Sequence, residues 1–83
     1  MTLQEKFEQA VLESKSLPEK PSNEILLKIY SLYKQATKGD VDGEKPIGFD
    51  FVNLAKYSAW ESLKGKNKED AMQEYINLIK SLK

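Results

Sequence analysis

The chain has 83 residues, with thirteen lysines balanced by thirteen acidic residues and with no cysteine or histidine. This balance excludes the overall positive field that favours binding to nucleic acid or to an anionic membrane surface. Without histidine and cysteine, the commonest general base and the most reactive nucleophile are missing, so we expect a protein that is not an enzyme.

The apolar residues are spread along the chain in short groups. No apolar run approaches the roughly 20 residues that cross a bilayer, and the N-terminal sequence lacks the apolar stretch of a secretory signal. The length suits one small domain. We therefore expect residues 1–83 to form a single soluble, cytoplasmic domain with no membrane span.

The spacing of apolar residues predicts two helices in the first half of the chain. The first covers residues 3–15 and ends at the proline-rich segment 17–21, because proline lacks an amide donor and keeps the preceding residue out of helical geometry. The second covers about residues 23–37, and either Ser22 or Asn23 can act as its N-cap.

A long loop and two further helices are predicted in the second half. Gly39 suits a left-handed helix cap, and residues 40–48 are rich in turn-forming residues without a sustained period. Helical spacing returns over residues 51–64 and stops at Gly65, after which Asn67 caps a last helix that reaches nearly to the end. The predicted fold class is therefore all-α, a four-helix bundle whose long loop lets the second and third helices run in a direction that a short turn would forbid.

Lysines and aromatic residues fall on faces that could meet where these helices pack. Tyr30 and Lys34 share one face of the second predicted helix. Lys56 lies beside Trp60 on the third, and Lys15 ends the first. Each lysine taken alone is more typical of a solvated surface. Together they suit a polyanionic ligand that carries an aromatic ring, which they would meet as point charges.

Two other charged groups are weaker candidates for chemistry. Glu5, Glu8 and Glu13 lie on the polar side of the first predicted helix and are typical of a solvated face. Residues 40–44 faintly resemble a calcium loop but lack its alternating ligands and the glutamate six residues after the glycine. We therefore expect no metal site.

Two segments carry a resemblance to a known family. Residues 29–40 read Ile-Tyr-Ser-Leu-Tyr-Lys-Gln-Ala-Thr-Lys-Gly-Asp, which resembles the acyl-CoA-binding protein signature with its core Tyr-x-x-Tyr-Lys-Gln-Ala-Thr-x-Gly-Asp. Residues 55–60 read Ala-Lys-Tyr-Ser-Ala-Trp and resemble the family's Ala-Lys-aromatic-x-Ala-Trp segment. The resemblance spans essentially the whole chain.

This resemblance implies a non-symmetric four-helix fold and a protein that binds medium- to long-chain fatty-acyl-CoA esters without catalysis, as an intracellular carrier and pool former. For the head group it implies that Tyr30, Lys34 and Lys56 contact the 3′-phosphate between the second and third helices. Tyr33 then flanks the adenine, and Lys15 is a supplementary cation.

For the acyl chain the resemblance implies a groove lined partly by the first and second helices. The apolar contacts would be Phe7, Leu26 and Leu27, and Tyr75 would contact the acyl–pantetheine region. Trp60 is expected in the core. The expected protein is a monomer with no cofactor, whose partner is the acyl-CoA ligand.

The alternative reading is a helical protein-interaction module that docks an amphipathic segment of a partner in an apolar groove. Such a module would need no lysines that face a phosphate. Titration with palmitoyl-CoA, palmitate and CoA separates the two readings.

Overall fold

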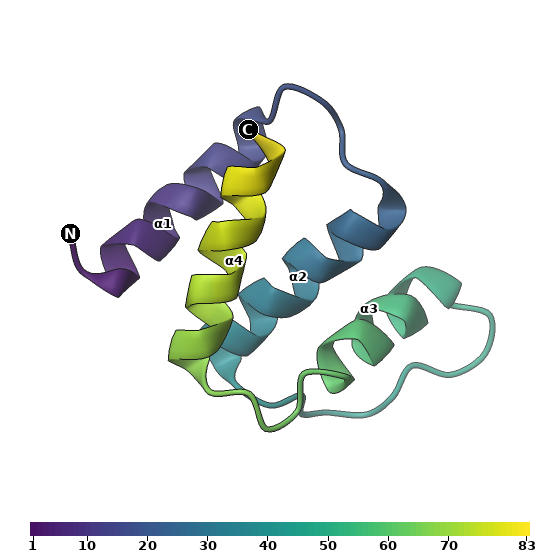
Figure 1. The fold of residues 1–83 in the computed structure, drawn as a ribbon. Helices are drawn as coiled ribbons and strands as arrows, with labels where there is room; N and C mark the ends of the chain where they lie inside the picture. The colour runs from purple at the N-terminus through teal and green to yellow at the C-terminus, as the bar shows by residue number, and fades with distance from the viewer.

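The computed structural model describes residues 1–83 and contains four α-helices and no strand (Figure 1). They are α1 (Leu3–Glu13), α2 (Asn23–Lys38), α3 (Phe51–Glu61) and α4 (Lys68–Leu82), and a 3₁₀ turn, Ser14–Ser16, follows α1. The predicted all-α class and number of helices are confirmed. The first and third helices are shorter than predicted, because the chain winds more tightly after α1 and turns at the end of α3.

Side-chain caps fix where the helices begin. The Thr2 hydroxyl accepts from the Glu5 amide while the Glu5 carboxylate accepts from the Thr2 amide, so α1 opens with a capping box. The Ser22 hydroxyl caps α2, and the Asn67 side chain accepts from the Asp70 amide to cap α4, as predicted. These caps satisfy amides that have no partner inside the helix.

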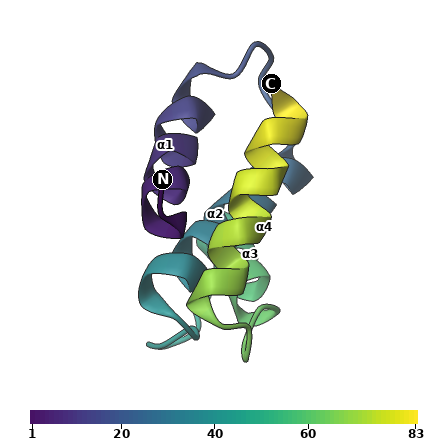
Figure 2. The same ribbon diagram turned by 60° about the vertical axis from the view of Figure 1, so that its left-hand side comes forward.

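The helices do not alternate in direction. In Figures 1 and 2, α1 and α4 run the same way side by side, and an ion pair between Lys83 and Glu13 joins their ends at 3.1 Å. The α2 helix runs opposite to α4, and the connection 39–50 carries the chain back so that α3 runs parallel to α2 (Figure 1). The predicted consequence of the long loop is confirmed.

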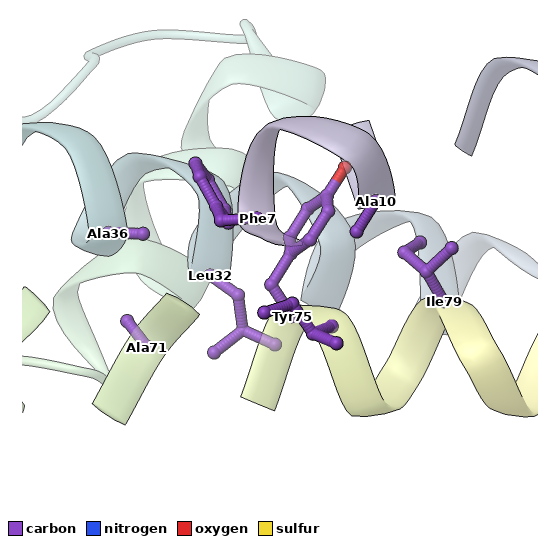
Figure 3. Packing of buried hydrophobic residues seen from close by; sticks show 8 residues of the cluster. Phe7, Ala10, Leu32, Ala36, Ala71, Tyr75 and Ile79 are labelled. Carbon is purple, nitrogen blue, oxygen red and sulfur yellow. The ribbon is translucent and has the colours of Figure 1, made fainter. Parts of the chain in front are cut away.

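The main core lies between α1, α2 and α4. Its buried apolar side chains interdigitate where these three helices meet, and α3 contributes none of them (Figure 3). They are Phe7, Ala10, Leu32, Ala36, Ala71, Tyr75, Ile76 and Ile79. The α3 helix packs mainly on α2, where Trp60 is its buried residue. No helix combines the length and the apolar character that crossing a membrane requires.

A polar network ties the end of α2 to the turn before α4. The buried Gln35 side chain donates through Nε2 to Asp40 Oδ1 at 2.9 Å and to the Lys66 carbonyl at 2.7 Å. The Gly65 amide donates to the same Asp40 oxygen at 2.8 Å. The hydrogen bonds from Gly65 and Gln35 hold the pKa of the Asp40 carboxyl below its usual value, since they favour the charged form.

Candidate ligand-binding site

An apolar groove of about 430 Å³ lies between the first turns of α2 and α3. Because the two helices run parallel, the first turn of one faces the first turn of the other across this groove. The residues that line it are Asn23, Leu26, Leu27 and Tyr30 from α2 and Phe51, Val52, Ala55 and Lys56 from α3. This volume is within the range of small-molecule sites.

Two lysines converge at the end of this groove. The Nζ atoms of Lys34 and Lys56 lie 5.8 and 5.3 Å from the centroid of the same Tyr30 ring. Lys34 Nζ is also 5.7 Å from the Trp60 ring centroid. Rings at this distance attract a cation through their negative faces. The three residues predicted to contact a phosphate are thus neighbours in the folded chain.

Neither of these lysines is paired with an acid. The ion pairs in the structure are Lys66 with Glu74 and Lys83 with Glu13, and none of these four residues lines the groove. Lys34 and Lys56 are half-buried residues with no acidic partner. Two unpaired ammonium groups over one ring therefore form a positively charged position that an anion can occupy.

Tyr33 lies on the neighbouring side of α2, over the edge of the core. Its ring is stacked with Phe7 at a centroid distance of 6.0 Å, and Phe7 meets Tyr75 edge-on at 5.1 Å. Phe7 and Tyr75 are each only 2% exposed, whereas Tyr33 is 40% exposed. Burial raises the pKa of the Tyr75 hydroxyl. Tyr33 is therefore the surface member of an aromatic group whose other two members are core residues.

The structure brings some of the predicted ligand-contact residues together at the groove and places the others elsewhere. Leu26 and Leu27 line the groove that ends at Tyr30, as the prediction of an apolar wall from the second helix requires. Phe7 and Tyr75 do not line it, so the groove has no wall from α1. Lys15 lies exposed in the 3₁₀ turn after α1, and no hydrogen bond, ion pair or cation–π contact joins it to the other lysines.

Four lining residues were not foreseen as site residues: Asn23, Phe51, Val52 and Ala55. Phe51 and Ala55 belong to the apolar line that indicated the third helix, and such a line usually faces a core. Here Phe51 and Val52 are mostly exposed, because α3 packs mainly on α2 and its first turn lies outside the main core. The sequence did contain one signal for these residues. Apolar residues precede Lys56 on α3, just as Leu26 and Leu27 precede Lys34 on α2.

A larger groove of about 590 Å³ lies among α2, α3 and α4. The carboxylates of Glu24 and Glu74 line it together with a single cation, Lys28. This balance suits a polyanion less well than the pair of unpaired lysines, so the smaller groove is the better candidate. No group of three or more acidic, histidine or cysteine side chains is arranged to hold a metal ion.

Comparison with known proteins decides the family. Residues 4–79 match the model of the family described as "Acyl CoA binding protein". The chain belongs to this family. It is 51% identical over 76 residues to the "Acyl-CoA-binding protein" of Saccharomyces cerevisiae, an alignment that covers 92% of this chain and 87% of the yeast protein. The crystal structure of Oryza sativa Acyl-CoA-Binding Protein 2 has a TM-score of 0.93 and 44% identity, and covers 98% of this chain and 90% of that one.

A third relative carries a similar segment within a longer protein. The "Enoyl-CoA delta isomerase 2" of Rattus norvegicus is 48% identical over 79 residues, which cover 95% of this chain but only 20% of the rat protein. Over most of its length, the chain is therefore similar to proteins named for acyl-CoA binding. The isomerase contains a related segment.

The acyl-CoA-binding protein signature serves two purposes in this fold. Tyr30, Tyr33 and Lys34 present their side chains toward the groove end or the adjoining surface. Gln35 and Asp40 instead hold the turn before α4. The family motif thus combines candidate ligand contacts with the hydrogen bonds that fix the end of α2.

Proposed function

We propose that the chain binds medium- to long-chain fatty-acyl-CoA esters without catalysis and acts as an intracellular carrier and pool former. The observation that carries this proposal is the convergence of Lys34 and Lys56 on the Tyr30 ring at the end of an apolar groove. An acyl-CoA has the matching polarity, since it joins a phosphorylated nucleotide to a long hydrocarbon chain. The names of the family and of its relatives support the same ligand.

For the head group, we propose that Tyr30, Lys34 and Lys56 bind the 3′-phosphate. Each lysine can donate a charge-assisted hydrogen bond to a phosphate oxygen, and the Tyr30 hydroxyl can donate a third. Tyr33 would flank the adenine, a role that its exposed ring supports. Lys15 would be a supplementary cation that reaches the ligand's phosphates from the end of α1.

For the acyl chain, we propose the groove between α2 and α3, with Leu26 and Leu27 as contacts and Phe51 opposite. A sixteen-carbon chain has about fourteen methylenes, so full burial would contribute at most about 11 kcal/mol before ordering costs are subtracted. Phe7 and Tyr75 would contribute indirectly, because their rings pack against the Tyr33 ring that would flank the ligand. Chain burial would thus dominate affinity, and the phosphate would set specificity.

A role in binding rather than catalysis fits the side chains at the site. The groove and its basic end contain lysines, tyrosines and apolar residues, with no nucleophile positioned beside a general base. The carrier would work as a monomer in the cytoplasm. A protein-docking module is less well supported, since it would not need two unpaired lysines at the groove end.

Calorimetric titration with palmitoyl-CoA, palmitate and CoA tests this function. We expect a one-to-one complex with palmitoyl-CoA that is far tighter than either fragment, because only the ester engages both the groove and the lysines. Release of thiol from palmitoyl-CoA should stay at the level of a buffer control. Comparable affinity for palmitate would contradict the proposed carrier function. Protein-dependent release of thiol would show that the chain is an enzyme.

A further inference from the structure

Four large apolar side chains are exposed together where the connection after α2 enters α3. Ile47 is 89% exposed, Phe49 90%, Phe51 67% and Val52 68%. The Phe49 and Phe51 rings lie edge to face with centroids 6.1 Å apart. We call these four residues the loop patch. An exposed cluster of this kind marks a binding surface more often than scattered single residues do.

The loop patch continues into the groove between α2 and α3. Phe51 and Val52 belong to both, and the exposed edge of Leu26 lies across the same groove. Figure 1 shows the start of α3 and the connection before it at the edge of the molecule, away from α1 and α4. An apolar path therefore runs from an outer edge of the protein into the proposed chain-binding groove.

We propose that the loop patch docks reversibly on the surface of a lipid bilayer, so that an acyl chain passes between the membrane and the groove without crossing water. This proposal rests on the proposed function, since the ligand must be an amphiphile that dissolves in bilayers. Ile47 and Phe49 would enter the boundary between head groups and acyl chains. Phe51 and Val52 would lie at the mouth of the groove.

The size of the patch favours a lipid surface over a protein partner. Its four side chains present roughly 500 Å² of apolar surface, whereas a stable protein interface takes about 800 Å² and 20–30 residues from each partner. Insertion into a bilayer has no such threshold, because each apolar side chain contributes as it leaves water. A second copy of this chain is therefore a poorer occupant than a membrane.

The charges around the patch decide which kind of membrane it suits. Acidic side chains at Asp42, Glu44 and Asp50 outnumber the lysines at Lys45 and Lys56 over this part of the chain. An anionic lipid surface would repel this excess, so docking depends on apolar insertion and tolerates salt. Neutral phosphatidylcholine is accordingly a sufficient surface.

Flotation of the ligand-free protein with phosphatidylcholine vesicles tests the proposal. Even a single myristoyl chain binds membranes with an association constant of only about 10⁴ M⁻¹, so the assay uses lipid at about 5 mM in order to detect docking weaker than that. The test variant carries Ile47→Ser and Phe49→Ser, two exposed residues that do not line the groove. Leu12→Ser, which removes an exposed leucine from α1, is the matched control. Palmitoyl-CoA affinity in solution is measured for all three proteins by calorimetry.

We expect the double variant to lose about fivefold or more of the vesicle-bound fraction. Leu12→Ser should float like the wild type, about 1 M NaCl should leave binding intact, and both variants should retain palmitoyl-CoA affinity. Equal flotation of wild type and double variant, loss of flotation in salt, or absence of wild-type flotation would each overturn the membrane proposal. Concentration-dependent dimerisation in sedimentation, abolished by the double variant, would assign the patch to a second copy. Failure of the proposed function would show separately, as absent palmitoyl-CoA binding in the wild type.

Discussion

The indole Nε1 of Trp60 in α3 donates a hydrogen bond of 2.8 Å to the carbonyl of Gly39 at the end of α2. This bond joins the two helices at the end where the lysines converge. The same indole ring lies 5.7 Å from Lys34 Nζ. Because α3 gives no side chain to the main core, Trp60 is its principal anchor. The position of Lys56 therefore depends on this residue.

Replacing Trp60 by phenylalanine should destabilise the fold and weaken ligand binding. The change removes one hydrogen bond and part of a buried ring, which should lower the free energy of unfolding by about 1–3 kcal/mol. Urea unfolding followed by circular dichroism measures it. Tyr57→Phe on the same helix is the control, since the Tyr57 hydroxyl makes no hydrogen bond within the protein. Equal stability of Trp60→Phe and wild type would mean that α3 is held elsewhere.

Hydrogen exchange should be uneven among the helices. The amides of α3 should exchange faster than those of α4, because α4 supplies Ala71, Tyr75, Ile76 and Ile79 to the core while α3 packs mainly on α2. Palmitoyl-CoA should slow exchange in α3 more than in α4, since the ligand would bridge α3 to α2. Equal slowing across all four helices would indicate global stabilisation without contact at α3.

Acid should weaken the hydrogen-bonded tie between Asp40 and the turn before α4. Hydrogen bonds from Gly65 and Gln35 lower the pKa of Asp40 from 3.8, so its contribution to stability is complete above about pH 4 to 5 and is lost as the pH falls through the lowered pKa. Asp40→Asn should therefore be less stable than wild type at pH 7. The difference should shrink toward zero as the pH falls below the folded-state pKa.

Urea unfolding of both proteins between pH 7 and pH 2 checks this dependence. Asp42→Asn is the control, because that carboxylate makes no hydrogen bond and lies exposed in the loop. A stability difference for Asp40→Asn that stays constant over the whole pH range would show that the charge is irrelevant.

The length of the acyl chain should determine the effect of substitutions in the groove. Leu26→Ala should weaken palmitoyl-CoA by about 1–2 kcal/mol, octanoyl-CoA by less, and CoA hardly at all, because the lost area scales with chain contact. Calorimetry with the three ligands measures the trend, and Leu12→Ala on α1 is the matched control. An equal loss for CoA and palmitoyl-CoA would make Leu26 a structural residue.

Much of this arrangement could be predicted from the sequence. The spacing of apolar residues and the capping residues Ser22 and Asn67 predicted the positions of the helices. The length of the loop between α2 and α3 predicted that these two helices need not alternate in direction. Tyr30 and Lys34 are one turn apart, so their shared face followed from helix geometry alone. Their shared contact with one phosphate together with Lys56 also required the packing of α3 on α2, and that contact was implied only by the family resemblance.

Other features depended on packing that periodicity does not describe. An apolar residue on a helical line can face a core or a ligand groove, and the sequence gives both the same pattern. Phe7 was expected to line the acyl groove, yet it is a core residue stacked beneath Tyr33. Phe51 belongs to the apolar line of α3, yet it is exposed because that helix packs mainly on α2 and lies outside the main core.

The 3′-phosphate contact is the most direct test of the proposed binding mode. Calorimetry would compare palmitoyl-CoA with palmitoyl-dephospho-CoA, which lacks this phosphate, for wild type, Lys34→Ala and Lys28→Ala. Lys28 is an exposed lysine on the same helix that lines the other groove, so it controls for the loss of one charge. We predict that Lys34→Ala weakens palmitoyl-CoA by about 1.5–3 kcal/mol and hardly affects the dephospho ligand, while Lys28→Ala changes neither. Equal weakening of both ligands by Lys34→Ala would contradict the assignment of Lys34 to the 3′-phosphate.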